Sequence, residues 1–381
     1  MPGKQKVLFL IESLSAGGAE RVLLTILKHL DNTRFEVTLC SIVDKWQYKN
    51  DIPHNISYLA LLPDASSLSG LRLLIYKLKY KLLYSFLSPR WAYRMFVPKN
   101  SDVEVAFVEG EVTKILSGST NAIALKLAWV HIDLEKYPWT QASGVYKNKH
   151  EEAKVYSCFD KIVGVSDSVC RAFKSRFDVE AVTAYNPVDS CQIISLAKEK
   201  VGVPAKSSFR IISLGRLAPQ KAFDRLLRVA SKLKEEGEEF ELWILGEGGC
   251  RSMLEKLIDD THLSGTVTLW GFKSNPYPYV VASDLFVCSS LAEGYSTAAS
   301  EALILGVPVL TTRCAGMEEL IGPSGGGVVV DNNEDALYEG LKKIMRESTY
   351  YQRLKTSAVA RRTDFRLDVA MSHIESLLSG C

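Results

Sequence analysis

The chain has 381 residues, of which 47% are hydrophobic and 24% are charged. This composition can bury a sizeable core, so it excludes a disordered chain and a low-complexity fibre. Lysine and arginine total 46 against 44 for aspartate and glutamate, a balance that excludes a protein whose whole surface binds nucleic acid.

The N-terminus carries a short apolar run at 7–11 and no small-residue cleavage site, so it does not resemble a signal peptide, and we expect a cytoplasmic protein. Lysine or arginine interrupts every stretch that approaches the roughly 18 apolar residues of a membrane-spanning helix. The eight cysteines are scattered without a Cys-x-x-Cys pair. This pattern predicts reduced core thiols rather than a metal site or a disulfide framework.

The first half of the chain alternates strands and helices. It opens on the apolar run 6–12, which is typical of a parallel strand buried on both faces. A loop and an amphipathic helix at 19–30 follow. Further strands are predicted at 35–43, 103–108, 123–130 and 161–165. This order indicates an α/β domain.

The second half repeats the same plan. It opens with a strand at 209–215, a helix at 224–234 and a strand at 240–246. The remaining strands are predicted at 267–270, 284–288, 308–312 and 327–330, and the remaining helices at 251–257, 297–305 and 334–345. Each half is therefore predicted to be a doubly wound, Rossmann-like α/β domain.

We place the joint between the two domains near residue 195, where Asn-Pro and Gly-Val-Pro interrupt the alternation. The predicted domains are 1–195 and 196–364. A last amphipathic helix lies within 365–381. It could pack against either half, including the first domain. Two such domains that face a central cleft would surround it with the carboxyl ends of their strands, where open α/β sheets bind ligands.

The motif most informative about chemistry runs from Leu291 to Pro308, across a strand end, a turn and a helix. It carries Glu293 in the turn and Glu301 inside the helix, so that both could face the cleft. Backbone N–H groups of 294–297 point out of the helix start, which suits a phosphate or a sugar oxygen. Alternatively, Glu293 only caps the helix and Glu301 is a solvated surface residue.

Two other strand ends are followed by loops that suit an anion. Arg216 and Lys221 follow the strand 209–215 and are well placed to hold a diphosphate leaving group, although surface cations are common. After the first strand, Gly17 and Gly18 open a helix and let a ligand approach the backbone closely. This pair does not fit Gly-x-Gly-x-x-Gly, so a dinucleotide-binding domain is disfavoured.

Taken together, these motifs resemble a known family, the retaining glycosyltransferases of the GT-B fold and the family 4 type. The motifs that recur there in this order are Gly17-Gly18-Ala19-Glu20, Gly215-Arg216 with Lys221, Gly246-Glu247-Gly248, and Glu293-Gly294-Tyr295 leading to Glu301. The family is a large group of nucleotide-sugar enzymes that build bacterial surface polysaccharides and lipid-linked glycans. The resemblance covers nearly the whole chain and is most specific from 209 to 313.

The resemblance implies roles for residues of both halves. Arg216 and Lys221 would bind the donor diphosphate. Gly17 and Gly18 of the first domain would contact the same diphosphate. Glu301 would hold the ribose hydroxyls.

Glu293, with the backbone of Gly294, Tyr295 and Ser296, would meet the donor sugar and its phosphate. His131, at a strand end, matches the position of a family histidine near the sugar's C6 region and the acceptor. We take Glu293 and His131 as the candidate catalytic residues. Alternatively, His131 is a packing residue.

A basic segment, residues 65–101, contains no aspartate or glutamate but many leucine and aromatic residues. This composition suits a helix lying in an anionic lipid interface, with Arg72, Lys77, Lys79 and Lys81 at the membrane surface. The alternatives are an ordinary basic helix that covers the core of the first domain, and a nucleic-acid patch. No recognised nucleic-acid motif accompanies the segment, so we expect no nucleic-acid partner.

The resemblance therefore implies a retaining, hexosyl-type glycosyltransferase that moves a sugar from a UDP- or GDP-sugar to a glycan or lipid-linked oligosaccharide acceptor, in polysaccharide biosynthesis. We expect it to be a peripheral protein on the inner face of the membrane. No Asp-x-Asp occurs, so we expect no essential metal and no cofactor. The alternatives are a GT-B-fold epimerase or phosphorylase, and a non-catalytic, membrane-associated glycan-binding relative.

Overall fold

The structure is a computed structural model that describes residues 3–15, 17–45, 51–323 and 325–380. Two compact units make up the chain: Met1–Pro187 with Asp368–Cys381, and Val188–Leu367. The boundary at Pro187 lies before the expected one near residue 195. The reason is that Ile193 packs into a hydrophobic core of the second unit.

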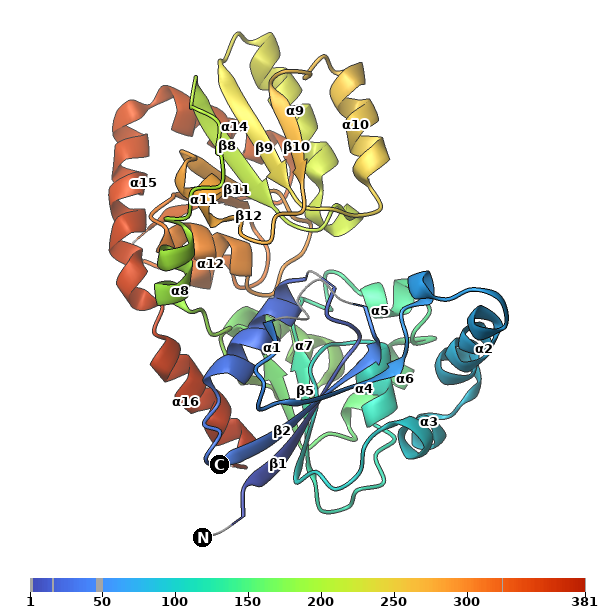
Figure 1. The fold of residues 1–381 in the computed structure, drawn as a ribbon. Helices are drawn as coiled ribbons and strands as arrows, with labels where there is room; N and C mark the ends of the chain where they lie inside the picture. Colours follow the sequence, from blue (N-terminus) through green and yellow to red (C-terminus); the bar gives the residue numbers. More distant parts are fainter. Residues whose placement is uncertain (1–2, 16, 46–50, 324, 381) are drawn as a thin grey trace. The chain divides into compact units, whose positions relative to one another are not determined.

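The first unit contains a seven-stranded sheet in the order β3-β2-β1-β4-β5-β6-β7 (Figure 1). All neighbouring strands are parallel. The strands are β1 (Gln5–Ile11), β2 (Phe35–Val43), β3 (Ser57–Leu62), β4 (Val103–Ala106), β5 (Leu125–Val130), β6 (Lys161–Gly164) and β7 (Val182–Thr183). The hydrophobic pattern misses the edge strands β3 and β7, because most of their side chains are only half-buried.

Helices connect these strands, and the last helix of the chain also belongs to this unit. The helices are α1 (Gly18–His29), η2 (Ala65–Ser67), α2 (Gly70–Lys81), the π-helix η3 (Leu82–Phe86), α3 (Pro89–Phe96), α4 (Glu111–Leu116), α5 (Trp139–Ala142), α6 (Lys149–Tyr156), α7 (Asp167–Phe177) and α16 (Leu367–Leu378). Glu375 of α16 pairs with Arg34 at 2.8 Å and accepts from the N–H of Asp31 at 2.9 Å. These contacts hold α16 against the first unit.

The second unit has a six-stranded sheet in the order β10-β9-β8-β11-β12-β13, again all parallel. The strands are β8 (Phe209–Leu214), β9 (Phe240–Leu245), β10 (Val267–Gly271), β11 (Leu285–Cys288), β12 (Val309–Thr312) and β13 (Gly327–Val330). Both sheets are open and doubly wound, which confirms the predicted fold class.

Two separate hydrophobic cores show that helices cover both faces of this sheet. The helices are α8 (Ser190–Leu196), η4 (Pro219–Lys221), α9 (Phe223–Glu235), α10 (Arg251–Asp260), α11 (Tyr277–Val281), α12 (Thr297–Ile304), α13 (Met317–Ile321), α14 (Glu334–Arg346), α15 (Ser348–Ala360) and η5 (Arg361–Asp364). One core contains buried residues of α9, α10 and α14, and the other contains those of α8, α11, α12 and α13.

The described cysteines are free, and four of them are buried: Cys40, Cys170, Cys288 and Cys314. Cys158 and Cys191 are exposed on the surface, so the prediction of core thiols is wrong for these two. Among the residues that the structure describes, no helix is long and apolar enough to cross a lipid bilayer.

Candidate functional site

The candidate site of the second unit lies where its strand order reverses. β8 and β11 are neighbours, with β9 and β10 beyond β8 and with β12 and β13 beyond β11. In open α/β sheets, ligands bind at this point, beyond the carboxyl ends of the strands. The segment after β8 carries Arg216 and Lys221, and the loop after β11 carries Glu293. The topology therefore brings together residues that are distant in sequence.

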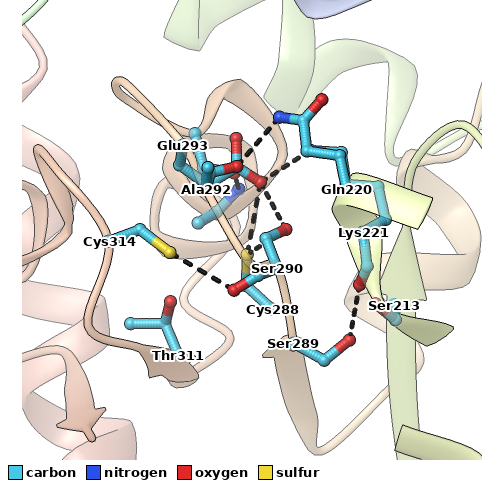
Figure 2. Close-up of polar contacts among 12 residues, drawn as sticks. Ser213, Gln220, Lys221, Cys288, Ser289, Ser290, Ala292, Glu293, Thr311 and Cys314 are labelled. Atoms are coloured by element: carbon cyan, nitrogen blue, oxygen red, sulfur yellow. Dashed lines mark hydrogen bonds and ion pairs between the residues drawn. The ribbon is translucent and has the colours of Figure 1, made fainter. Parts of the chain in front are cut away.

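Lys221 and Glu293 form an ion pair at this point (Figure 2). Nζ of Lys221 lies 2.6 Å from Oε1 of Glu293, and the two side chains are 23% and 9% exposed. Burial is the largest single influence on the pKa of Lys221 and lowers it, but the Glu293 carboxylate and Cys288 together outweigh burial, so that the pKa is raised. The lysine therefore stays charged throughout the physiological range.

The same carboxylate oxygen accepts two further hydrogen bonds. The hydroxyl of Ser290 donates to Oε1 of Glu293 at 2.6 Å, and the thiol of Cys288 donates to it at 3.6 Å. Within the described part of the chain, the structure gives Oε2 of Glu293 no hydrogen-bond partner. The carboxylate is thus held through one oxygen, and the other can accept a hydrogen bond from a ligand hydroxyl.

Glycines allow the strand-end loops of β8 and β9 to approach closely. A side chain on Gly246 would clash with the carbonyl oxygen of Gly215, and one on Gly248 would clash with the carbonyl of Leu217. Gly215 has φ +159° and lies against the aliphatic part of Lys221, which a Cβ would approach to 3.1 Å. The glycines of these motifs therefore serve the packing of the loops around Lys221.

Arg216 is exposed, and its side chain makes no hydrogen bond or ion pair with the residues that the structure describes. Its charge acts on Lys221 and opposes the rise of the pKa there, which places the two cations near each other. One cation is thus paired with Glu293 and the other is open to solvent. Such a pair suits an anion with two charged groups, such as a diphosphate.

α12 starts beside this pair and is capped by Ser296, whose hydroxyl oxygen accepts from the N–H of Ala299 at 3.4 Å. Glu293 is therefore not the capping residue. Glu301 is only 5% exposed, and the hydroxyl of Tyr277 donates to its Oε1 at 3.1 Å. Both alternative interpretations of the two glutamates are therefore wrong.

Gly294 and Tyr295 connect Glu293 to α12. Gly294 is buried and Tyr295 is half-buried. Burial raises the pKa of Tyr295 to about 12, so its phenol stays protonated. Contacts of the backbone of 294–296 with a donor sugar, and of Glu301 with a ribose, stay predictions.

The glycine pair of the first unit stands at the start of α1. Gly17 is the capping residue and Gly18 the first residue of the helix. A side chain on Gly17 would clash with the carboxylate of Glu20, which folds back over the helix start. An anion bound here would meet this carboxylate. Phosphate binding by Gly17 and Gly18 stays a prediction that requires Glu20 to move.

His131 follows β5 in the first unit. Its Nε2 lies 2.8 Å from the carbonyl oxygen of Phe107, so Nε2 carries the proton and Nδ1 is left as an acceptor. Burial lowers the pKa of His131 to about 4. The carboxylate of Glu109 accepts hydrogen bonds from the backbone N–H groups of His131 and Ile132. His131 is therefore neutral at pH 7 and can accept a hydrogen bond through Nδ1.

Sequence reasoning missed three residues that contact the candidate catalytic residues. Glu109 binds the backbone of His131, and Cys288 and Ser290 donate to Glu293. Each stands at or just beyond the carboxyl end of a strand, β4 for Glu109 and β11 for the other two. The same positional signal that selected His131 and Glu293 would have found them.

The basic segment forms α2, η3 and α3, and Figure 1 shows α2 at the periphery of the first unit. None of the residues of α2 is buried, so the alternative of a helix that covers the core is wrong for α2. The four predicted membrane-surface cations, Arg72, Lys77, Lys79 and Lys81, are all exposed on it.

Large apolar side chains share this surface. Leu71 is 71% exposed and Phe86 is 68% exposed, and Trp91 and Met95 of α3 are also more than half exposed. Tyr84 of η3, whose hydroxyl donates to Glu12 after β1, and buried Tyr93 of α3, whose hydroxyl donates to Glu104 at 2.6 Å, attach the segment to the unit. The segment α2, η3 and α3 therefore exposes a surface that is both basic and apolar.

Comparison with known proteins supports one family. Residues 197–361 match the family described as Glycosyl transferases group 1. Over 98% of its length, the chain is 28% identical to the whole of the N-acetylgalactosamine-N,N'-diacetylbacillosaminyl-diphospho-undecaprenol 4-alpha-N-acetylgalactosaminyltransferase of Campylobacter jejuni.

Solved structures share the fold over the full chain. HepE from Anabaena, in complex with UDP and glucose, has a TM-score of 0.75 and 19% identity, covering 99% of this chain and 100% of that one. Sucrose-phosphate synthase from Thermosynechococcus elongatus has a TM-score of 0.78 and 16% identity, covering 99% of each chain. At these identities the likeness establishes the fold alone.

Proposed function

We propose a specific reaction for this chain, which is a glycosyltransferase of the GT-B fold and of the family 4 type. It transfers a hexosyl group from a nucleotide-sugar donor to a glycan acceptor carried on a lipid, with retention of the anomeric configuration. The product serves the synthesis of a surface polysaccharide or glycoconjugate. The name of the C. jejuni relative, which contains a glycan on diphospho-undecaprenol, supports this class of acceptor.

One observation carries the proposal: Arg216, Lys221 and Glu293 stand together at the switch point of the second unit. Arg216 and Lys221 bind the donor diphosphate and stabilise the charge that develops on it as it leaves. Glu293 accepts a hydrogen bond from the donor sugar through Oε2. UDP in a structural neighbour supports a uridine donor.

In this reaction the bond from the anomeric carbon to the diphosphate oxygen breaks, and a bond to an acceptor hydroxyl oxygen forms on the same face. The acceptor proton passes to the departing phosphate. No protein nucleophile takes part, so the rate depends on positioning and on charge stabilisation. His131 supplies Nδ1 as a hydrogen-bond acceptor, and Arg216 and Lys221 take the place of a metal ion.

A thermal-shift screen of UDP-, GDP- and ADP-sugars tests the donor. A ligand at 100 times its Kd stabilises a protein by about 2.7 kcal/mol. Turnover is then measured with and without a polyprenyl-diphosphate glycan. An epimerase or phosphorylase would release an epimer or a sugar phosphate without an acceptor product, and a non-catalytic relative would leave the donor intact. Arg216→Ala should lower transfer more than tenfold at unchanged stability, because one charge-assisted contact contributes about 1.5–3 kcal/mol.

We also propose that α2, η3 and α3 dock on the inner face of an anionic membrane, as a peripheral attachment. The exposed cations suit anionic headgroups, each contributing about 1 kcal/mol near the surface. The exposed leucine, phenylalanine and tryptophan side chains suit the lipid boundary. This surface would bring a lipid-carried acceptor to the enzyme.

Replacing Lys77, Lys79 and Lys81 with glutamate should release the protein from anionic vesicles and spare transfer to a short soluble acceptor. A charge-matched control replaces three exposed lysines elsewhere on the first unit, Lys147, Lys149 and Lys154. Equal vesicle binding by both triple variants would show that α2 is not the docking surface.

A further inference from the structure

The part of the loop that leads to Glu293, residues 289–292, is bound by side chains of other elements. The carbonyl oxygens of the four residues before Glu293 each accept a hydrogen bond from a different side chain, and that of Ser290 accepts a second, weaker one from the thiol of Cys314 at 3.3 Å. The donors are Arg225 to Ser289 at 2.6 Å, Thr312 to Ser290 at 2.6 Å, Asn332 to Leu291 at 2.9 Å and Gln220 to Ala292 at 2.8 Å. We call these four donors the carbonyl clamp.

The members of the carbonyl clamp come from four separate places in the second unit. Gln220 lies on η4, Arg225 on α9 and Thr312 at the end of β12, and Asn332 follows β13. Arg225 also donates to the side-chain oxygen of Asn332 at 2.9 Å, so two members are joined to each other. An ordinary buried loop needs partners for its carbonyls, but four successive side-chain donors also restrain each peptide of the loop separately.

The clamp also joins the loop of Glu293 to the segment of Lys221. The carbonyl of Gln220 accepts from the N–H of Leu291 at 2.8 Å, and its side chain donates to Ala292 (Figure 2). The hydroxyl of Ser289 donates to the carbonyl of Lys221 at 2.9 Å. One backbone hydrogen bond and two hydrogen bonds from side chains to carbonyls thus hold together the two segments that carry Lys221 and Glu293.

We propose that the carbonyl clamp positions Glu293 for the donor, and that Gln220 and Thr312 are its decisive positioning residues. The proposal rests on the proposed function and deepens it, because it names residues that act through Glu293. Catalysis by positioning depends on displacements well below an ångström. A carboxylate held through one oxygen needs a loop that does not move.

Thr312 offers the cleanest test, since Thr312→Val keeps its shape and removes its hydroxyl, whereas Thr312→Ser keeps the hydroxyl. Gln220→Leu is the second variant, on a half-buried residue. Ser283→Ala is the matched control, because this buried hydroxyl also donates to a carbonyl, that of Tyr279 at 2.8 Å, away from the loop.

Three quantities are measured on the full chain: hydrogen exchange of the amides of 289–293, the Kd of UDP, and kcat with the donor found in the screen. Thr312→Val and Gln220→Leu should each speed exchange and lower kcat by about tenfold, the effect of one lost buried hydrogen bond. The Kd of UDP should stay within about twofold of the parent. Thr312→Ser should restore both, and Ser283→Ala should lower only the melting temperature.

A Glu293→Gln background makes the test specific, because residues that act through Glu293 cost nothing further once it is gone. Thr312→Val should therefore leave the kcat of Glu293→Gln unchanged. Additive losses, parent-like exchange in both clamp variants, or a Kd of UDP that rises as much as kcat falls would each overturn the proposal. A parent protein that turns over no donor would instead refute the proposed function, and the exchange rates would still decide whether the clamp exists.

Discussion

The ion pair between Lys221 and Glu293 should couple the two residues energetically far more than the exposed ion pairs of the same unit do. The perturbation is a cycle of Lys221→Met, Glu293→Gln and the double variant. Nζ and Oε1 lie 2.6 Å apart, which corresponds to a Coulomb energy of about 6 kcal/mol at an effective dielectric constant of about 20. Desolvation of the two largely buried groups offsets part of this energy.

We therefore expect a coupling free energy of about 2–3 kcal/mol in the unfolding free energy, and each single variant to lose about 3 kcal/mol because it leaves a largely buried charge without its partner. Lys206 and Asp284 provide the control. Their atoms are 2.7 Å apart, but the lysine side chain is 47% exposed, so solvent screening should reduce their coupling below about 1 kcal/mol.

The assay is equilibrium urea unfolding of both sets of variants at pH 7, with the cycle repeated in saturating UDP. A diphosphate that shares Lys221 should reduce the coupling, because the lysine then has a second anionic partner. Equal coupling in the two pairs would refute the reasoning, since it would mean that burial does not strengthen the pair of Lys221 and Glu293.

Three further predictions follow from the remaining site residues. Glu301→Gln should mainly raise the Kd of UDP and Glu293→Gln should mainly lower kcat; equal losses of UDP affinity in calorimetry would contradict the division of roles. Sugar transfer should continue in the presence of EDTA, because Arg216 and Lys221 can neutralise the diphosphate without a metal ion. A complete loss of transfer that magnesium restores would contradict this. Burial raises the pKa of Glu109 to about 7, so its protonated form stabilises the fold at low pH and this stability is lost as the pH rises through 7. Glu109→Gln should therefore gain up to about 3 kcal/mol on the parent between pH 5 and pH 8 in urea unfolding, and a constant difference would show that Glu109 titrates normally.

Local pattern predicted the buried strands well. β2 and β13 occupy the predicted ranges 35–43 and 327–330, because buried parallel strands are continuous apolar runs. The edge strand β3 and the helix α15 were missed, since half-buried elements show a weak pattern. The exposure of Cys158 and Cys191 was missed for the same reason, as no pattern assigned their side chains to a face.

The sequence by itself determined which residues stand at strand ends, and therefore that Arg216, Lys221 and Glu293 are candidates for the chemistry. Only the tertiary structure decided that Lys221 faces Glu293 across 72 positions of sequence and that four distant donors bind the loop before Glu293. Periodicity reports the surroundings of one element at a time, whereas these contacts depend on the order of strands in the sheet, which neighbouring residues do not encode. Likewise, the pattern left helix α16 open to either half, and contacts with Asp31 and Arg34 assigned it to the first.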